Sequence, residues 1–142
     1  MVEEAEAQTK VLSRANCNTG QGRKFRVLVI DDEPRIVHLL NVRLKLSGYE
    51  VITAGNGEHG LELARTETPD VILLDLLMPG KDGFEVLKEL RTFSRVPVIV
   101  VSAREDTLAS RVVKALGADD ALGKPFNWEQ LLSRIERMRW RC

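Results

Sequence analysis

The stretch FRVLVIDDEP, residues 25–34, decides the fold of this chain. It begins with an apolar run rich in β-branched residues, which is typical of a strand buried on both faces of a parallel sheet. A second run of this kind, VILLD (71–75), also ends in an acid, so Asp31, Asp32 and Asp75 each follow a predicted strand. Because parallel strands end at one edge of their sheet, we expect these three carboxylates to converge there.

Outward from these two runs, segments of strand type and helix type alternate along the chain. Strands are predicted over residues 25–30, 49–53, 71–75, 96–102 and 118–122. Apolar residues at helical spacing follow each strand, over residues 34–47, 57–65, 84–90, 108–116 and 128–138. The second of these helices should be weak, because its two glycines cost roughly 1 kcal/mol each relative to alanine.

This alternation predicts an α/β fold, a doubly wound five-stranded parallel sheet with helices on both faces. The flavodoxin-like strand order 2-1-3-4-5 is expected, with its switch point between the first and third strands. Those are the strands that end in Asp31-Asp32 and in Asp75.

Size and composition indicate the number of domains and which classes of partner the net charge favours. The chain has 142 residues, 44% of them hydrophobic, which suits one domain with a real core. Residues 1–24 lack a core pattern and are expected to form a flexible N-terminal extension, and residues 25–142 to form the domain. Lys+Arg and Asp+Glu both number 21, so net charge favours neither nucleic acid nor membrane. No apolar stretch approaches the roughly 20 residues of a membrane span.

The two cysteines, Cys17 and Cys142, form neither a disulfide framework nor a zinc spacing. The N-terminus carries no apolar signal segment. We therefore expect a cytoplasmic protein.

Three converging acids repel one another unless a cation or a proton neutralises them. A hard cation with oxygen ligands, most plausibly Mg²⁺, would do so and would also attract phosphate. Asp75 is then a candidate nucleophile that forms an acyl phosphate. Each acid alone could instead cap a helix or solvate a turn, and Asp31 or Asp32 could cap the helix that begins near Pro34.

Two further strand ends carry groups suited to phosphate. Ser102 ends the fourth strand, and its hydroxyl could donate to a phosphoryl oxygen. Lys124, after the fifth, could neutralise a developing phosphoryl anion. Either residue alone is ordinary in a turn, but four of the five predicted strands end in such a group.

Four motifs together resemble the receiver domain of a two-component response regulator, from about Phe25 to Arg141. They are VLVIDDEP (27–34), VILLDLLMPGKDGFEVL (71–87), PVIVVSAR (97–104) and KALGADDALGKPF (114–126). The resemblance implies that a sensor histidine kinase phosphorylates Asp75, and that Ser102 and Lys124 contact the phosphoryl group. It also implies catalysis limited to the domain's own phosphotransfer and slow autodephosphorylation, so the protein is not expected to be an enzyme.

The same resemblance implies how Mg²⁺ is held. Asp32, Asp75 and the backbone carbonyl of Leu77 would bind the ion directly, and Asp31 through water. A cis Lys124-Pro125 bond is also expected, because only proline makes the cis form cheap.

The pattern GADD followed by KPF is most similar to the winged-helix (OmpR/PhoB-type) branch, whose members control transcription through a DNA-binding output domain. No such domain is expected in this chain, so DNA contact would require a segment absent here. In that branch the fourth helix, fifth strand and fifth helix form a homodimer face, and Lys114, Asp119, Asp120 and Arg134 match its ion-pairing positions. Where the branch usually has an aromatic switch residue, this chain has Ala121.

Two other functions stay open from the sequence. An aspartyl-phosphate phosphohydrolase would need a second acid two residues after the nucleophile, where this chain has Leu77. A single-domain or phosphorylation-independent interaction module is the other alternative, and Ala121 is its motivation.

Overall fold

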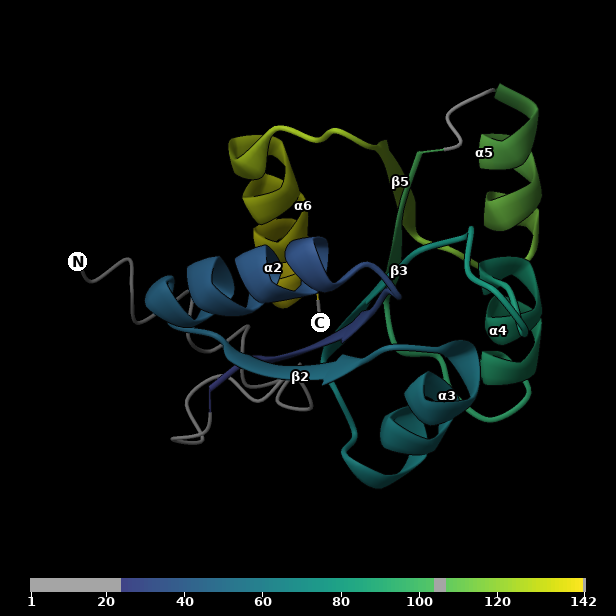
Figure 1. Ribbon diagram of the computed structural model, residues 1–142, viewed down its shortest axis with the longest axis horizontal. Helices are drawn as coiled ribbons and strands as arrows, with labels where there is room; N and C mark the ends of the chain where they lie inside the picture. Colours follow the sequence, from purple (N-terminus) through teal and green to yellow (C-terminus); the bar gives the residue numbers. More distant parts are fainter. Residues whose placement is uncertain (1–23, 104–106, 142) are drawn as a thin grey trace.

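The computed structural model describes residues 24–103 and 107–141 of the chain (Figure 1). Of the expected N-terminal extension, residues 1–23 lie outside this described part. The strands are β1 (Arg26–Ile30), β2 (Glu50–Ala54), β3 (Val71–Leu74), β4 (Val98–Ser102) and β5 (Asp120–Gly123). The helices are α2 (Pro34–Leu46), α3 (Gly57–Thr66), α4 (Gly83–Leu90), α5 (Thr107–Ala115) and α6 (Trp128–Arg141). Among the described residues, no helix combines the length and apolar character needed to cross a bilayer.

All five strands run parallel in the order β2-β1-β3-β4-β5, as the sequence predicts. β1 and β3 are neighbours, and Ile30 pairs with Leu74. The next residues along the two strands are Asp31 and Asp75, so the strand register brings these two acids to the same level of the sheet.

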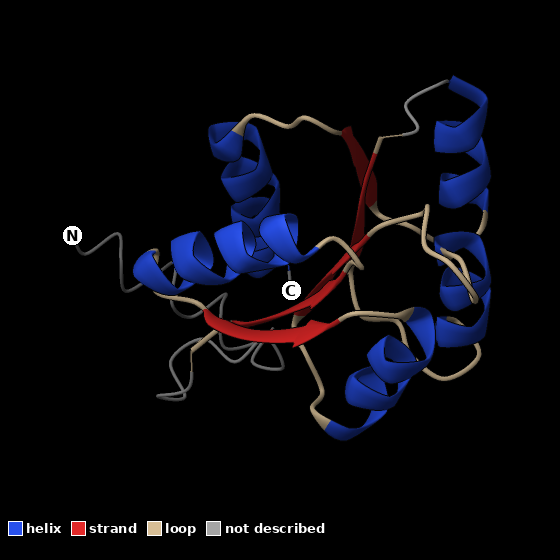
Figure 2. Ribbon diagram, viewed as in Figure 1, coloured by secondary structure: helices blue, strands red, loops and turns tan. Residues whose placement is uncertain are grey.

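Helices cover both faces of the sheet (Figure 2). Leu40 and Leu44 of α2 pack with Ile135 of α6 over the face that includes Val29 and Leu73. The opposite face is covered by α3, α4 and α5, whose buried side chains form a second cluster with Leu28, Ile30, Ile72, Leu74 and Val100. Burial on both faces explains why the central strands are apolar at every position.

Strand boundaries differ from the sequence prediction at β4 and β5. β4 begins at Val98 rather than Val96, because Pro97 lies between them and has no N–H to donate to the sheet. β5 begins at Asp120 rather than Ala118, because the Ala118 N–H still donates to the Val113 carbonyl at the end of α5.

The helix expected to be weak, α3, is regular over its ten residues. Asn56 caps it by accepting a 2.8 Å hydrogen bond from the His59 N–H. A Cβ at Gly60 would lie 2.5–2.9 Å from three side-chain carbons of Ile30. The glycine therefore lets α3 approach β1 closely, and this packing offsets the low helix propensity of glycine.

Gly83, the first residue of α4, packs against the backbone that carries Asp75. A Cβ there would collide with the Asp75 carbonyl oxygen and lie 2.6 Å from the Leu76 Cα. Backbone cannot move aside as a side chain can, so the clash should outweigh the better helix propensity of alanine. We expect Gly83→Ala to lower the free energy of unfolding by about 1–3 kcal/mol in urea titrations.

Gly55→Ala is the matched control for this change. Its Cβ would meet no atom within 4 Å, and Gly55 is not among the glycines with positive φ. A Gly83→Ala protein as stable as the Gly55→Ala protein would contradict this account of α4 packing.

Candidate functional site

The acidic residues are fixed at the sheet edge by backbone hydrogen bonds that continue the strands. The Asp31 N–H donates to the Ala54 carbonyl at 3.1 Å, and the Asp75 N–H donates to the Ile30 carbonyl at 3.0 Å. The backbone that carries each of the two carboxylates therefore continues the hydrogen-bonding pattern of the sheet.

Asp31, Asp32 and Asp75 converge as the sequence predicts. One carboxylate oxygen from each lies within 4.8 Å of those of the other two. Asp31 is 4% exposed and Asp75 is 5% exposed, whereas Asp32 is open to solvent. Two buried carboxylates and one exposed carboxylate thus share a small volume at the end of β1 and β3.

Lys124 supplies the cation that faces this cluster. It follows β5 and precedes a cis peptide bond to Pro125, as expected. Its Nζ lies 2.9 Å from Asp31 Oδ2, 3.7 Å from Asp75 Oδ2 and 3.7 Å from Glu33 Oε1. A single ammonium therefore lies near three carboxylates, so these four groups together carry more negative than positive charge when they are ionised.

Ser102 and Leu77 complete the rim. Ser102 is the last residue of β4, is 1% exposed, and accepts through its carbonyl a 2.9 Å hydrogen bond from the Lys124 N–H. The Leu77 N–H donates to Asp75 Oδ1 at 3.4 Å, and its side chain is 51% exposed. A shallow pocket opens here, lined by Asp32, Glu33, Pro34, Asp75, Leu77, Ala103 and Lys124.

Burial, followed by the charge of Asp31, raises the pKa of the Asp75 carboxyl to about 6. Asp32 adds to this increase, while Lys124 and the Leu77 N–H oppose it. Asp75 is therefore a carboxylate whose ionised form is costly at neutral pH.

The pKa of the Lys124 ammonium is raised above its ordinary value, although the residue is largely buried. Burial alone would lower it, but the hydrogen bond to Asp31 and the charges of Asp31, Asp75 and Glu33 together raise it. Lys124 is therefore held in its charged form by the acids that it faces.

These residues fit a hard divalent cation. The donors are carboxylate oxygens, which Mg²⁺ prefers, and three of them lie close enough to share one ion. The pKa of Asp75 is raised first by burial and then by the charge of Asp31, and a bound cation would favour its ionised form.

Glu33 is a site residue that the sequence reasoning missed. It is the N-cap residue of α2, yet its side chain makes no capping hydrogen bond and lies near Lys124 instead. Asp31 Oδ1 accepts a 3.0 Å hydrogen bond from the Glu33 N–H, so neither Asp31 nor Asp32 is the N-cap residue of α2. The sequence places Glu33 directly after Asp31 and Asp32, but it does not indicate that the Glu33 side chain turns toward Lys124.

Three of the four residues matched to a dimer face, Asp119, Asp120 and Arg134, already have partners within the chain. Asp120 Oδ1 lies 2.7 Å from Arg134 Nη1, and Asp120 Oδ2 lies 3.9 Å from Arg137 Nη1. Asp119 Oδ2 accepts a 2.9 Å hydrogen bond from the Val98 N–H. Lys114 is exposed on α5.

Arg91 ties Asp119 to the end of the sheet that is remote from the acidic cluster. Its guanidinium lies 3.4 Å from Asp119 Oδ2 and donates to the carbonyls of Ser94, Val96 and Gly117. Gly117 has a φ of 107°, which favours glycine, and a Cβ there would lie 2.8 Å from Arg91 Nε. This network joins the end of α4 to the turn between α5 and β5.

Ala121, at the position expected to carry an aromatic switch, lies on β5 opposite Val100 and packs against the core cluster under α5. Its methyl group offers far less volume to displace than an aromatic ring would.

A family model, curated proteins and solved structures all match most of the chain. The family model described as the response regulator receiver domain matches residues 27–136. The probable transcriptional regulator ycf27 of Porphyridium aerugineum is 43% identical over 113 residues, which cover 80% of this chain and 47% of that protein. The ycf27 protein of Guillardia theta is 44% identical over 112 residues, or 79% and 44% of the two chains. The chain thus spans about half the length of the curated relatives it matches.

Solved structures share the fold. The receiver domain of the Francisella response regulator 1452 has a TM-score of 0.78 and 34% identity, over 82% of this chain and 97% of that chain. The BeF3-activated N-terminal receiver domain of Klebsiella pneumoniae RstA has a TM-score of 0.77 and 26% identity, over 82% and 99%.

The raised pKa of Asp75 predicts a pH-dependent stability when divalent cations are removed with chelator. Between the unfolded pKa of about 4 and the folded value of about 6, the folded chain keeps a proton that the unfolded chain loses. The contribution of Asp75 to stability therefore falls as pH rises through this range. We expect Asp75→Asn to be more stable than the unmodified protein at pH values well above this range, by about 1–3 kcal/mol, and the gain to shrink toward the lower end.

Chemical denaturation at several pH values measures this difference. Glu62→Gln, which removes an exposed acid from α3, is the control and should change stability little at any pH. A gain for Asp75→Asn that is the same at every pH would rule out the electrostatic explanation.

Proposed function

The chain belongs to the response regulator receiver family and holds the receiver domain of a two-component response regulator, and we propose that Asp75 is its phosphate acceptor. The observation that carries this proposal is the position of Asp75, a buried carboxylate 3.7 Å from the Lys124 ammonium and within one cluster with two other acids. The match over residues 27–136 supports residues 25–142 as the receiver.

The donor would be the phosphohistidine of a sensor histidine kinase. A carboxylate oxygen of Asp75 attacks the phosphorus, the new O–P bond forms as the N–P bond breaks, and the leaving imidazole takes up a proton. Lys124 would neutralise the transferred phosphoryl group, and Ser102, at the end of the neighbouring strand, would donate its hydroxyl to a phosphoryl oxygen.

We infer that Asp32, Asp75 and the Leu77 carbonyl would hold Mg²⁺, with Asp31 acting through water. When bound, the ion would neutralise the acids and attract the phosphoryl oxygens. The role of the protein is to fix the oxygens beforehand, through the backbone hydrogen bonds of Asp31 and Asp75.

The receiver is a regulator rather than a conventional enzyme. We infer that its own catalysis is limited to phosphotransfer and slow autodephosphorylation. Leu77 supports this, because a phosphohydrolase of this chemistry needs a second acid where Leu77 exposes an apolar side chain.

Output would pass through the face made by α5, β5 and α6. The curated relatives are named probable transcriptional regulators, so we propose that this receiver controls transcription through a DNA-binding segment outside residues 25–142. A homodimer through Lys114, Asp119, Asp120 and Arg134 stays a prediction, as does the cytoplasmic location. Because Ala121 replaces the aromatic switch residue, a shift of populations at this face would rely on backbone movement of β5.

Phosphorylation at Asp75 can be tested directly. Incubation with radiolabelled acetyl phosphate and Mg²⁺ should label the unmodified protein, and Asp75→Asn should abolish the label because an amide cannot form the acyl phosphate. Asp82→Asn is the matched control, since Asp82 lies in the same loop and asparagine can replace it as N-cap of α4. Equal labelling of the Asp75→Asn protein would refute the assignment.

The proposed magnesium site predicts a linked effect on stability. Mg²⁺ should raise the melting temperature of the unmodified protein, because a ligand that binds only the folded state stabilises it. Asp32→Asn removes an exposed ligand without disturbing the buried pair, so about tenfold more Mg²⁺ should be needed for the same rise.

Thermal denaturation across a Mg²⁺ titration measures this shift, with Asp82→Asn again as control. An Asp32→Asn protein that responds to Mg²⁺ like the unmodified protein would place the ion elsewhere.

A further inference from the structure

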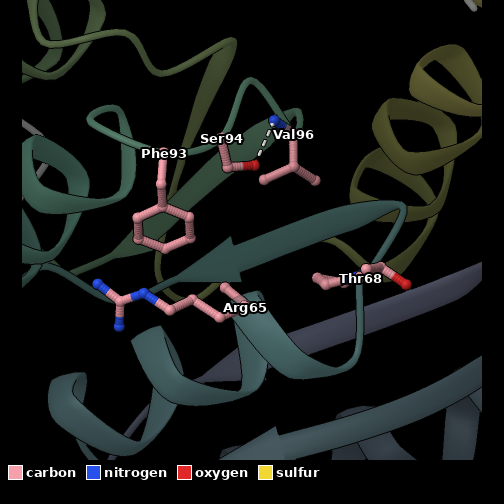
Figure 3. Close-up of a pocket in the computed structure, with 7 residues that line it drawn as sticks. Arg65, Thr68, Phe93, Ser94 and Val96 are labelled. Carbon is pink, nitrogen blue, oxygen red and sulfur yellow. Dashed lines mark hydrogen bonds between the residues drawn. The ribbon is translucent and has the colours of Figure 1, made fainter.

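A pocket opens where the turn after α3 faces the loop after α4. Figure 3 shows Arg65 and Thr68 on one side of it and Phe93, Ser94 and Val96 on the other. Both segments lead into the beginning of a strand, whereas the acids follow strand ends, so the pocket and the acidic cluster lie at opposite edges of the sheet. The volume of this Phe93 pocket is about 350 Å³, near the lower limit of roughly 300 Å³ for small-molecule sites.

The floor of the Phe93 pocket is apolar and fixed in place. Ala64 and Pro69, which line it, are buried, and Val96 is half-buried. The loop that carries Val96 is held by Arg91, whose Nη1 donates to the Ser94 carbonyl at 3.1 Å and to the Val96 carbonyl at 2.8 Å. The pocket is therefore preformed, and a ligand would not have to order this loop in order to bind.

The polar side chains around this floor include a cation and a hydroxyl. The Arg65 guanidinium lies 4.3 Å from the centre of the Phe93 ring. Ser94 Oγ accepts a 3.1 Å hydrogen bond from the Val96 N–H, which leaves the hydroxyl hydrogen to donate. None of the described residues that line the pocket is acidic. The pocket therefore offers donors and a positive charge to whatever enters it.

The carbonyl ends of α3 and α4 also point toward this edge of the sheet and by themselves would favour a cation. The last-turn carbonyls of Leu63 and Leu90 already accept backbone hydrogen bonds, which weakens this effect. The Arg65 guanidinium covers a face of the Phe93 ring, so a cationic ligand would meet like charge there. An anionic group is therefore the better match for the Phe93 pocket.

Thr68, which lines the pocket, has a backbone conformation that threonine disfavours. Its φ is 43°, and within the described part of the chain it is the only residue other than glycine with a positive φ. A β-branched residue is strained there, whereas glycine would not be. The turn is held beyond Thr68 by the Asp70 N–H, which donates to the Arg26 carbonyl at 2.8 Å. Strain that the surroundings maintain in this way is typical of ligand-binding sites.

We propose that the Phe93 pocket binds a small amphipathic carboxylate. The apolar body of the ligand packs on the floor made by Ala64, Pro69 and Val96, and its carboxylate pairs with Arg65. The ion pair of Arg65 with Glu89, at 3.8 Å, is longer than a hydrogen bond, so the guanidinium keeps N–H groups for a ligand. Two parallel N–H groups of a guanidinium match the two oxygens of a carboxylate. The phosphate chemistry proposed for the acidic cluster plays no part in this binding.

Phenylbutyrate is a probe of this chemical class, and titration of the full chain followed by amide NMR tests its binding. We expect saturable shifts of the amide resonances of Arg65, Thr68 and Val96. The dissociation constant should be on the order of 1 mM, as for an ordinary ligand of about twelve heavy atoms. Phenylbutanamide, the neutral counterpart, should bind about fivefold more weakly or worse, because it cannot form the charged pair with Arg65.

Two variants test the residues. Arg65→Gln should weaken phenylbutyrate binding about fivefold or more. Arg43→Gln is its matched control, because Arg43 also stacks over an aromatic ring, 4.8 Å from the centre of Trp128, and it should leave binding unchanged. Thr68→Gly should weaken binding and yet raise the melting temperature, because glycine relieves the strain at positive φ while it removes a side chain from the pocket.

Three outcomes would overturn the proposal. Shifts that do not saturate at concentrations well above the expected dissociation constant would mean that the pocket binds no such ligand. Equal binding of phenylbutanamide, or equal binding of phenylbutyrate by the Arg65→Gln protein, would remove the carboxylate from the recognition. Saturable shifts confined to residues around Asp75 would place the probe at the acidic cluster instead.

Discussion

The structure depends on the pairing of β1 with β3 at the centre of the sheet. Ile30 opposite Leu74 fixes the level at which both strands end, and the hydrogen bond from the Asp75 N–H to the Ile30 carbonyl carries that register one residue further. A slip of one residue would turn the acids to opposite faces, because side chains alternate along a strand. The apolar packing on both faces therefore protects the geometry of the acidic cluster as well as the fold.

The cluster itself is an arrangement that folding alone would not favour. Burying Asp31 and Asp75 side by side costs free energy, and Lys124 recovers part of it by facing both acids together with Glu33. The residual repulsion favours a positive charge beside Asp75, in keeping with the magnesium site and the phosphate acceptor proposed here. The charge distribution that makes ionised Asp75 costly is thus also the one on which the proposed chemistry would depend.

Much of this could be predicted from the sequence. The parallel sheet follows from the alternation of strands and helices, and the meeting of Asp31, Asp32 and Asp75 follows from apolar runs that end in acids, because parallel strands end at one edge. Features that depend on side-chain direction could not be predicted. Glu33 turns toward Lys124, and Asp119 turns inward to Val98. The spacing of residues along the sequence indicates neither direction. The glycines of α3 were misleading for a related reason, since the close packing at Gly60 depends on Ile30 of β1 and that at Gly57 depends on Val86 of α4.

The Arg91 network has a mechanical consequence for β5. The Arg91 guanidinium pairs with the Asp119 carboxylate just before β5 begins. The guanidinium also donates to the Gly117 carbonyl, and the carboxylate accepts from the N–H of Val98, the first residue of β4. At the other end, β5 leads to Lys124, whose ammonium is held by charge rather than by packing. The beginning of β5 is therefore held by a partly buried ion pair and its hydrogen bonds, whereas the Lys124 side chain after its end is held by the charge of the acids. A change of charge among the three acids is therefore met first by Lys124, the residue through which β5 faces them.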